Sequence, residues 1–241
     1  MPKKRPPRVK THDRAVVVLG APRSGTTLVA TALGAHAGIA MLSEDCDGAM
    51  FTFVGGKLPG VKLCTPNHVD IERRWHWFYE PLRRIGWLRH HFNYRLPRSK
   101  LSLRDMAARA ELKIVCILRE PQANIAAIRR RAERSESVSR DMLRRTYGIY
   151  EKLSREPLME PHFLSYEKLI GDPEAQLRGL CQWLDLPFDA AMLDAPRLNP
   201  AYPEATFRAD KATAVVAELA AGDAELAGLH ARYRQLIALA Q

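Results

Sequence analysis

The sequence between residues 15 and 36 constrains the fold most, because it has the pattern of a buried strand, a glycine-bounded loop and a helix. Residues 15–19 form a short β-branched apolar run, and residues 26–36 carry apolar side chains at helical spacing. The loop between them, residues 20–27, reads GAPRSGTT and has the glycine spacing of a phosphate-binding loop. In such loops, backbone N–H groups converge on a phosphate at the positive end of the helix dipole. The segment therefore predicts an α/β unit that binds a phosphorylated ligand.

Two further segments repeat the order of strand, turn and helix. Residues 113–118 form an apolar run that is followed by a helical stretch over residues 122–131. Residues 162–165 form a third run and precede a helix with Asp172 at its cap and Pro173 at its first position. This alternation favours a P-loop-containing three-layer α/β fold, with a central, mainly parallel sheet and helices on both faces. Such sheets bind ligands at the carboxyl ends of their strands, so the loops after the first two strands are the predicted site.

Three other segments are predicted to pack around this sheet. Residues 139–153 have the apolar stripe of an amphipathic helix. Residues 211–241 are alanine-rich and helical in pattern, with Asp223 as a cap. The aromatic residues in the stretch 75–87 are predicted to contribute core or lid packing.

The loop departs from that of nucleotide triphosphatases in an informative way. Thr26 stands where those proteins place lysine, and a cation is available instead from Arg23. A magnesium-binding enzyme of this type would also end its second strand with an acidic residue, whereas the strand KIVCIL is followed by Arg119. An arginine at that place repels a metal ion and attracts a second phosphate.

These features together resemble a known family, the sulfotransferases that use 3′-phosphoadenosine 5′-phosphosulfate, and the loop is of the bacterial type. In that family a PRSGTT loop binds the 5′-phosphosulfate, and an arginine and a serine eight residues apart bind the 3′-phosphate. Arg119 matches the arginine, whereas Ala127 occupies the serine position. Residues 165–187 resemble the YEDL, DPE and FLGLP pattern that follows the third core strand in many members. The donor-binding residues that the resemblance implies are Pro22, Arg23, Ser24, Gly25, Thr26, Thr27, Arg119 and the position of Ala127.

The resemblance implies an enzyme that moves a sulfuryl group from this donor to a hydroxyl or amine by in-line transfer. The product would be 3′-phosphoadenosine 5′-phosphate, and no metal is expected. Arg23 would stabilise the charge that develops on the bridging oxygen. Lys62, in a GVKLCTP segment that loosely resembles a KTP-like motif of bacterial members, would be a second catalytic cation.

The base that accepts the proton of the acceptor is predicted to be Glu44. A glutamate at this distance after PRSGTT resembles the base of the tyrosylprotein branch, whose helix also carries the Ala-His pair seen here at Ala35 and His36. Asp45 and Asp47 are close enough in sequence to compete for the role. The histidines that are common bases in cytosolic members have no selecting context here, so a structural or surface role is expected for His36, His68, His90 and His91.

Composition sets the remaining limits. The 241 residues, of which 46% are hydrophobic, are enough for one domain, which is predicted over residues 14–241, and the basic residues 1–13 are predicted to form a disordered tail. The chain shows neither a secretion signal nor an apolar stretch of about 20 residues, so a cytoplasmic location is predicted. The net charge of +10 indicates an anionic partner, which the donor nucleotide satisfies, and nucleic acid is not expected. The scattered cysteines indicate neither a zinc site nor a disulfide framework; they are Cys46, Cys64, Cys116 and Cys181.

Two other functions stay open at the level of sequence. A P-loop small-molecule kinase or other nucleotide-binding enzyme would explain the loop but not the missing lysine and acidic residue. A degenerate, basic binding module would explain the net charge and the arginine-rich residues 129–145, but not the loop. The acceptor is not identified and could be a carbohydrate, a small molecule or a peptide. Additional contacts to the 3′-phosphate could come from Arg129, Arg130, Arg131, Arg208 or Lys211.

Overall fold

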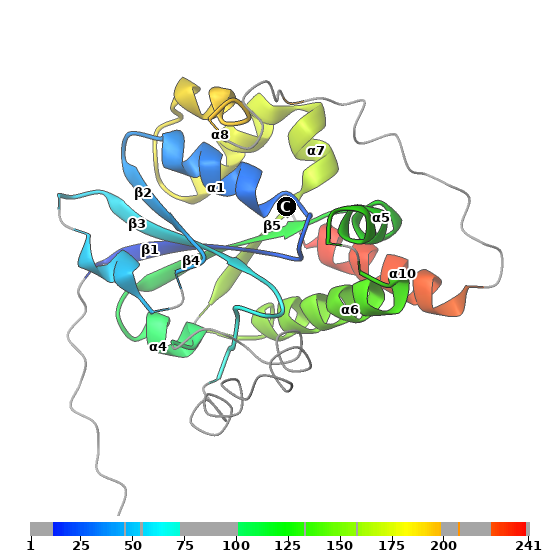
Figure 1. Cartoon of the computed structure of the whole chain (residues 1–241). Coiled ribbons are helices and arrows are strands. Elements are labelled where there is room, and N and C mark those ends of the chain that lie inside the picture. The colour runs from blue at the N-terminus through cyan, green and yellow to red at the C-terminus, as the bar shows by residue number, and fades with distance from the viewer. Residues whose placement is uncertain are drawn as a thin grey trace, which may run out of the picture.

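The computed structural model describes residues 12–45, 47–53, 55–72, 101–132, 134–157, 159–198, 207 and 223–239. Its centre is a five-stranded sheet with the strand order β2-β3-β1-β4-β5, and every neighbouring pair is parallel (Figure 1). The strands are β1 (Arg14–Gly20), β2 (Ile39–Ser43), β3 (Leu58–Cys64), β4 (Glu111–Leu118) and β5 (Glu160–Ser165). The predicted parallel α/β fold is therefore confirmed.

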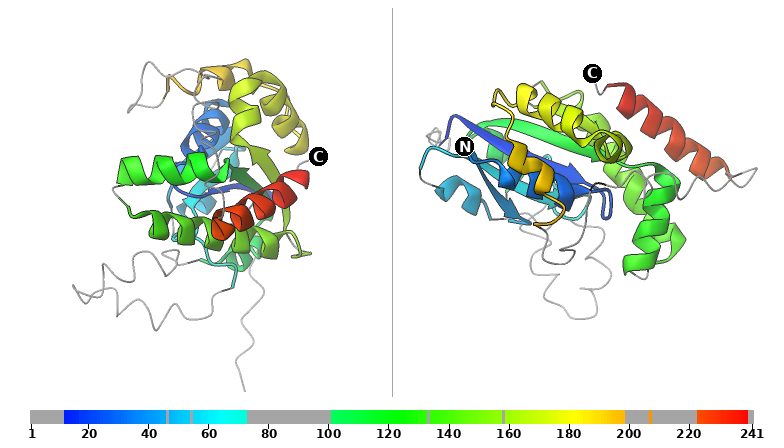
Figure 2. Two further views of the ribbon diagram at one scale, coloured as in Figure 1. Left: turned by 90° about the vertical axis from the view of Figure 1, so that its right-hand side faces the viewer. Right: turned by 90° about the horizontal axis from the view of Figure 1, so that it is seen from above.

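Helices cover both faces of the sheet and make it the middle of three layers (Figures 1 and 2). Along β1, Ala15, Val17 and Leu19 pack into one core and Val16 and Val18 into the other, all fully buried. The first core is closed by α4 (Leu103–Ala107), α5 (Pro121–Ala132), α6 (Glu136–Leu153) and α10 (Ala224–Ala238). The second is closed by α1 (Thr26–Ala35), α7 (Tyr166–Gly171) and α8 (Pro173–Trp183). Two short 3₁₀ helices, η1 (Ala49–Thr52) and η2 (Ala190–Asp194), complete the described elements.

The predicted starts of α1 and α8 agree with the structure, whereas α6 begins three residues earlier than predicted. Helix α1 begins at Thr26, and α8 begins at Pro173 after Asp172, whose carboxylate accepts a hydrogen bond from the Ala175 amide. Helix α6 begins before residue 139, because Ser135 caps it. Helix α10 is capped by Asp223, as predicted.

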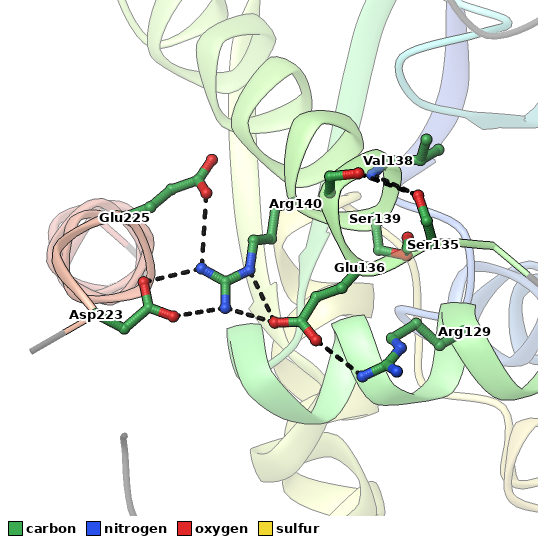
Figure 3. Close-up of polar contacts among 9 residues, drawn as sticks. Arg129, Ser135, Glu136, Val138, Ser139, Arg140, Asp223 and Glu225 are labelled. Carbon is green, nitrogen blue, oxygen red and sulfur yellow. Dashed lines mark hydrogen bonds and ion pairs between the residues drawn. The ribbon is translucent and has the colours of Figure 1, made fainter. Parts of the chain in front are cut away.

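The C-terminal helix is attached to the domain by an ionic cluster centred on Arg140 of α6 (Figure 3). The Arg140 guanidinium donates to both carboxylate oxygens of Asp223, at 2.8 and 2.5 Å, and to Glu136. Glu225 lies 3.6 Å from the same guanidinium. Because Arg140 donates to its carboxylate, the pKa of Asp223 falls to about 2. This cluster fixes the first turn of α10 against α6.

Several sequence predictions lie outside the described residues. These are most of the N-terminal tail, the aromatic stretch 75–87, His90, His91, Arg208 and the start of the predicted C-terminal helix at residues 211–222. Among the helices that the structure does describe, none has the length and apolar character that a membrane span requires.

Candidate active site

The carboxyl ends of four neighbouring strands bring the predicted site residues to one edge of the sheet. Gly20 ends β1 and is paired in register with Cys64 of β3 on one side and Ile117 of β4 on the other. The backbone N–H of Thr65 donates to the Gly20 carbonyl at 2.9 Å, which holds the end of β3 against the start of the loop. The edge beyond these strand ends is where a parallel α/β sheet binds its ligand.

Close packing shapes the loop over residues 20–27. A Cβ on Gly20 would lie 2.3 Å from Cγ2 of Thr26 and 2.5 Å from Cγ2 of Ile117, so only glycine fits there. Gly25 has a φ of +104°, a region that favours glycine, and precedes the first residue of α1. The buried Ser24 hydroxyl donates to the Ala21 carbonyl at 2.8 Å. The turn therefore leads directly into the amino end of α1, whose first-turn N–H groups can bind an anion.

The two arginines predicted to bind phosphate lie together. The Arg119 guanidinium donates to the Arg23 carbonyl at 2.9 Å and lies over the Tyr166 ring, 4.6 Å from its centroid. Arg23 itself is exposed and has a φ of +65°, which is a strained value for a residue other than glycine. The Arg23 carbonyl therefore contacts the Arg119 side chain. This contact joins the loop at residues 20–27 to the loop that follows β4, and the two together are called the loop system. Each of the two loops carries one of the two positive charges.

Two residues that sequence reasoning missed support this loop system. The Asn124 amide of α5, almost fully buried, donates to the Pro22 carbonyl at 2.8 Å. The Tyr150 hydroxyl of α6 donates to the carbonyls of Leu19 and Ile117, at 3.0 and 3.2 Å. No local pattern could indicate either contact, because each joins residues distant in sequence. Ala127 lies buried in α5, where it offers no hydroxyl group.

The predicted base and the second predicted cation form an ion pair. Glu44 follows β2, and its backbone N–H donates to the Lys62 carbonyl at 2.7 Å. Its Oε1 lies 3.1 Å from Nζ of Lys62, whose side chain is 7% exposed. Burial raises the pKa of Glu44, but the charge and hydrogen bond of Lys62, with smaller contributions from His68 and Cys64, together hold that pKa below its ordinary value. The carboxylate is therefore ionised near neutral pH and can accept a proton.

Asp45 and His36, which could compete with Glu44 for the role of base, make other contacts. The Asp45 carboxylate accepts hydrogen bonds from the backbone N–H groups of Asp47 and Met50, at 3.0 and 3.1 Å, and so organises the turn into η1. Nε2 of His36 lies 2.9 Å from the Pro187 carbonyl, while its Nδ1 accepts from the Gly38 amide. This assigns the Nε2–H tautomer and gives His36 a structural role, as expected.

Cys64 connects the ion pair to the phosphate loop. Its Sγ lies 3.6 Å from Oε1 of Glu44. Burial raises the pKa of the thiol, the charge of Glu44 raises it further, and the charge of Lys62 and a hydrogen bond with Thr26 lower it. Glu44, Lys62 and the first residue of α1 therefore surround one thiol, which places a carboxylate and an ammonium group beside the loop.

Comparison with known proteins points to one family. The sequence profile of the sulfotransferase family matches residues 106–190, a segment that includes Arg119 but not the phosphate loop. The chain resembles the sulfotransferases. No curated protein matches the chain.

Solved sulfotransferase domains share the fold. The sulfotransferase domain of the curacin biosynthetic pathway is 16% identical, with a TM-score of 0.56, and the match covers 92% of this chain and 98% of that one. The sulfotransferase domain of the Synechococcus PCC 7002 olefin synthase is also 16% identical, with a TM-score of 0.55, covering 93% and 94%. These structures confirm the predicted fold, and the family match over residues 106–190 supports the predicted enzyme class, a sulfotransferase.

Proposed function

We propose that the chain transfers a sulfuryl group from 3′-phosphoadenosine 5′-phosphosulfate to a hydroxyl or amine of an acceptor. The observation that carries this proposal is the joint position of Arg23, Arg119 and the Glu44–Lys62 pair at one sheet edge around the amino end of α1. The arrangement supplies two anion sites and one base. A donor with phosphates at both its 5′ and 3′ positions, and an acceptor that must lose a proton, require such a set of groups.

The donor would bind with its 5′-phosphosulfate in the loop. First-turn N–H groups of α1 and the Thr26 and Thr27 hydroxyls would donate to its oxygens, and the Arg23 side chain would neutralise the bridging oxygen as the S–O bond breaks. Arg119, oriented by the Arg23 carbonyl and the Tyr166 ring, would bind the 3′-phosphate. Ala127 leaves that phosphate without the hydroxyl of other members, so Arg119 carries more of the contact.

The acceptor would bind on the far side of the sulfur from the leaving oxygen, where Glu44 can take its proton. Sulfuryl transfer resembles phosphoryl transfer in depending mainly on positioning and on charge stabilisation. Lys62 would keep Glu44 ionised before transfer and could shift toward the sulfonate oxygens as charge develops there. Carbohydrates, small molecules and peptides all carry hydroxyls of the required kind.

A P-loop kinase remains the second candidate, because the strand, loop and helix suit a nucleoside triphosphate equally well. In that function a lysine at the position of Thr26 and an acidic residue at that of Arg119 would hold the phosphates and magnesium. Neither is present, so metal dependence separates the two candidates.

Titration calorimetry distinguishes these functions. The protein is titrated with 3′-phosphoadenosine 5′-phosphate in the presence of a chelator, and separately with ATP and Mg²⁺. We expect metal-independent binding of the bisphosphate, weakened about 10- to 100-fold by Arg23→Ala or Arg119→Ala, because a charge-assisted contact contributes roughly 1.5–3 kcal/mol. Arg178→Ala is the control for loss of one charge, since Arg178 pairs with Glu174 on the exposed face of α8. Preference for ATP with Mg²⁺ would overturn the proposal in favour of a kinase.

A further inference from the structure

Three side chains of different chemistry converge beside the phosphate loop. Ligand atoms of Glu44, Cys64 and His68 all lie within 4.8 Å of one another. Cys64 and His68 are held one turn apart, because the His68 backbone N–H donates to the Cys64 carbonyl at 2.8 Å. No sequence spacing predicts this cluster, since Glu44 reaches it from the neighbouring strand and lies 20 residues before Cys64.

The chemistry of the cluster is that of a zinc site. Zinc binds thiolate sulfur at about 2.3 Å and carboxylate oxygen or imidazole nitrogen at about 2.0 Å in tetrahedral geometry, which sets sulfur and oxygen ligands roughly 3.5 Å apart. The observed separation between Cys64 Sγ and Glu44 Oε1 is 3.6 Å. Three protein ligands leave a fourth position for water. We propose that Glu44, Cys64 and His68 bind one Zn²⁺ ion.

Lys62 is the competitor for this ion. Its ammonium lies 3.1 Å from the Glu44 oxygen that the metal would use, so the lysine side chain must withdraw when the ion enters. Coordination replaces the Cys64 S–H bond with an S–Zn bond, and the proton passes to solvent. His68 is buried and the Glu44 side chain is 46% exposed, so the ion would enter from the side of Glu44, and the two anionic ligands, Glu44 and the Cys64 thiolate, favour a divalent cation. Zinc and the Lys62 ammonium therefore bind Glu44 in mutually exclusive states.

A consequence for catalysis rests on the proposed function. If Glu44 is the base, zinc occupies the lone pairs that would accept the proton of the acceptor. Zinc then inhibits transfer without blocking the donor loop, and a chelator restores activity. The binding of zinc itself does not depend on the reaction that the protein catalyses.

Direct metal binding tests the site. The full-length protein is titrated calorimetrically with ZnCl₂, and Co²⁺ serves as a spectroscopic substitute whose absorption reports thiolate ligation and tetrahedral geometry. We expect one ion per chain, a more than about 10-fold weaker affinity in Cys64→Ser and in His68→Ala, and loss of the sulfur-to-cobalt band in Cys64→Ser. Lys62→Met should bind zinc several-fold more tightly, because it removes the competing cation.

His162→Ala is the matched control, since His162 lies on β5, stacks on Trp183 of α8 and is not part of the cluster. Circular dichroism and thermal unfolding establish that each variant is folded. Absence of saturable binding, or equal affinity in wild type, Cys64→Ser and His68→Ala, would overturn the proposal. Zinc binding that persists where the bisphosphate fails to bind would refute the proposed function and leave the zinc site standing.

Discussion

The two buried tyrosines of α6 offer a sharp test of how the two loops of the candidate site are held. Tyr150 donates to the carbonyls of Leu19 and Ile117, which lie in the strands that lead into the two loops of the site. Tyr147, one turn earlier and equally buried, has a hydroxyl that finds no hydrogen-bond partner among the described residues. Replacing each by phenylalanine removes one oxygen from the same helix, so the two variants differ in the hydrogen bonds lost.

The expected magnitudes follow from this difference. A net hydrogen bond contributes about 0.5–1.5 kcal/mol, and a buried carbonyl left unpaired adds to the loss, so Tyr150→Phe should lower the free energy of unfolding by about 1–2 kcal/mol. For a chain of this size that corresponds to a Tm decrease of about 2–8 °C. Tyr147→Phe should be neutral or slightly stabilising, because it removes a buried hydroxyl that has no partner.

Urea denaturation measures both variants, and unchanged m values would show that the denatured state is comparable. The control is wild type under the same conditions. Equal stability changes in Tyr150→Phe and Tyr147→Phe would refute the idea that the Tyr150 hydroxyl holds the carboxyl ends of β1 and β4.

Further predictions concern the loop and the C-terminal helix. Gly25→Ala should abolish calorimetric binding of the bisphosphate, because the new Cβ would lie 2.5 Å from Cδ2 of Tyr166. Gly55→Ala is the control: Gly55 has a similar φ of +113°, but a Cβ there would meet no atom within 4 Å, so this variant should bind the bisphosphate normally. Equal binding by the two would contradict the packing argument. Arg140→Gln should accelerate amide hydrogen exchange in α10, whereas the control Arg178→Gln should leave that exchange unchanged. If α10 kept its protection from exchange in Arg140→Gln, the ionic cluster would not be what holds the helix. The pKa of Asp223 is lowered to about 2, so its contribution to stability is complete above about pH 4 and is lost as the pH falls toward 2. Asp223→Asn should therefore lose less stability than wild type over that interval in parallel denaturation curves.

The part of the site that could be predicted from sequence is the part encoded locally. The loop at residues 20–27 and Arg119 each follow an apolar run directly, so the order of strand, loop and helix can be predicted from residues that are adjacent in sequence. Strand β3 was not predicted, because Pro59 and Gly60 within it are unfavourable in strands. The structure explains Gly60: a Cβ there would lie 2.2 Å from Sδ of Met41 and 2.7 Å from Cγ1 of Val16. Local strand propensity does not indicate such a close approach between neighbouring strands.

The contacts that complete the site depend on pairing between distant segments. Asn124 reaches Pro22 across 102 residues, and Tyr150 reaches Leu19 across 131. Cys64 comes next to Gly20 only through the register between β3 and β1. Strand β2 was also missed, because it is short and only partly buried, although it is what places Glu44 beside Lys62. The register of the strands and the crossover connections between them determine which residues become neighbours, and neither can be predicted from hydrophobic periodicity.

In the proposed function, Arg119 and the loop at residues 20–27 bind different phosphates of one nucleotide. Competition calorimetry with 3′-phosphoadenosine 5′-phosphate and with adenosine 5′-monophosphate, on wild type, Arg23→Ala and Arg119→Ala, tests it most directly. We predict that Arg119→Ala weakens the bisphosphate about 10- to 100-fold and leaves the monophosphate unchanged, whereas Arg23→Ala weakens both. Equal losses for the two ligands in Arg119→Ala would contradict the assignment of Arg119 to the 3′-phosphate, and with it the proposed donor.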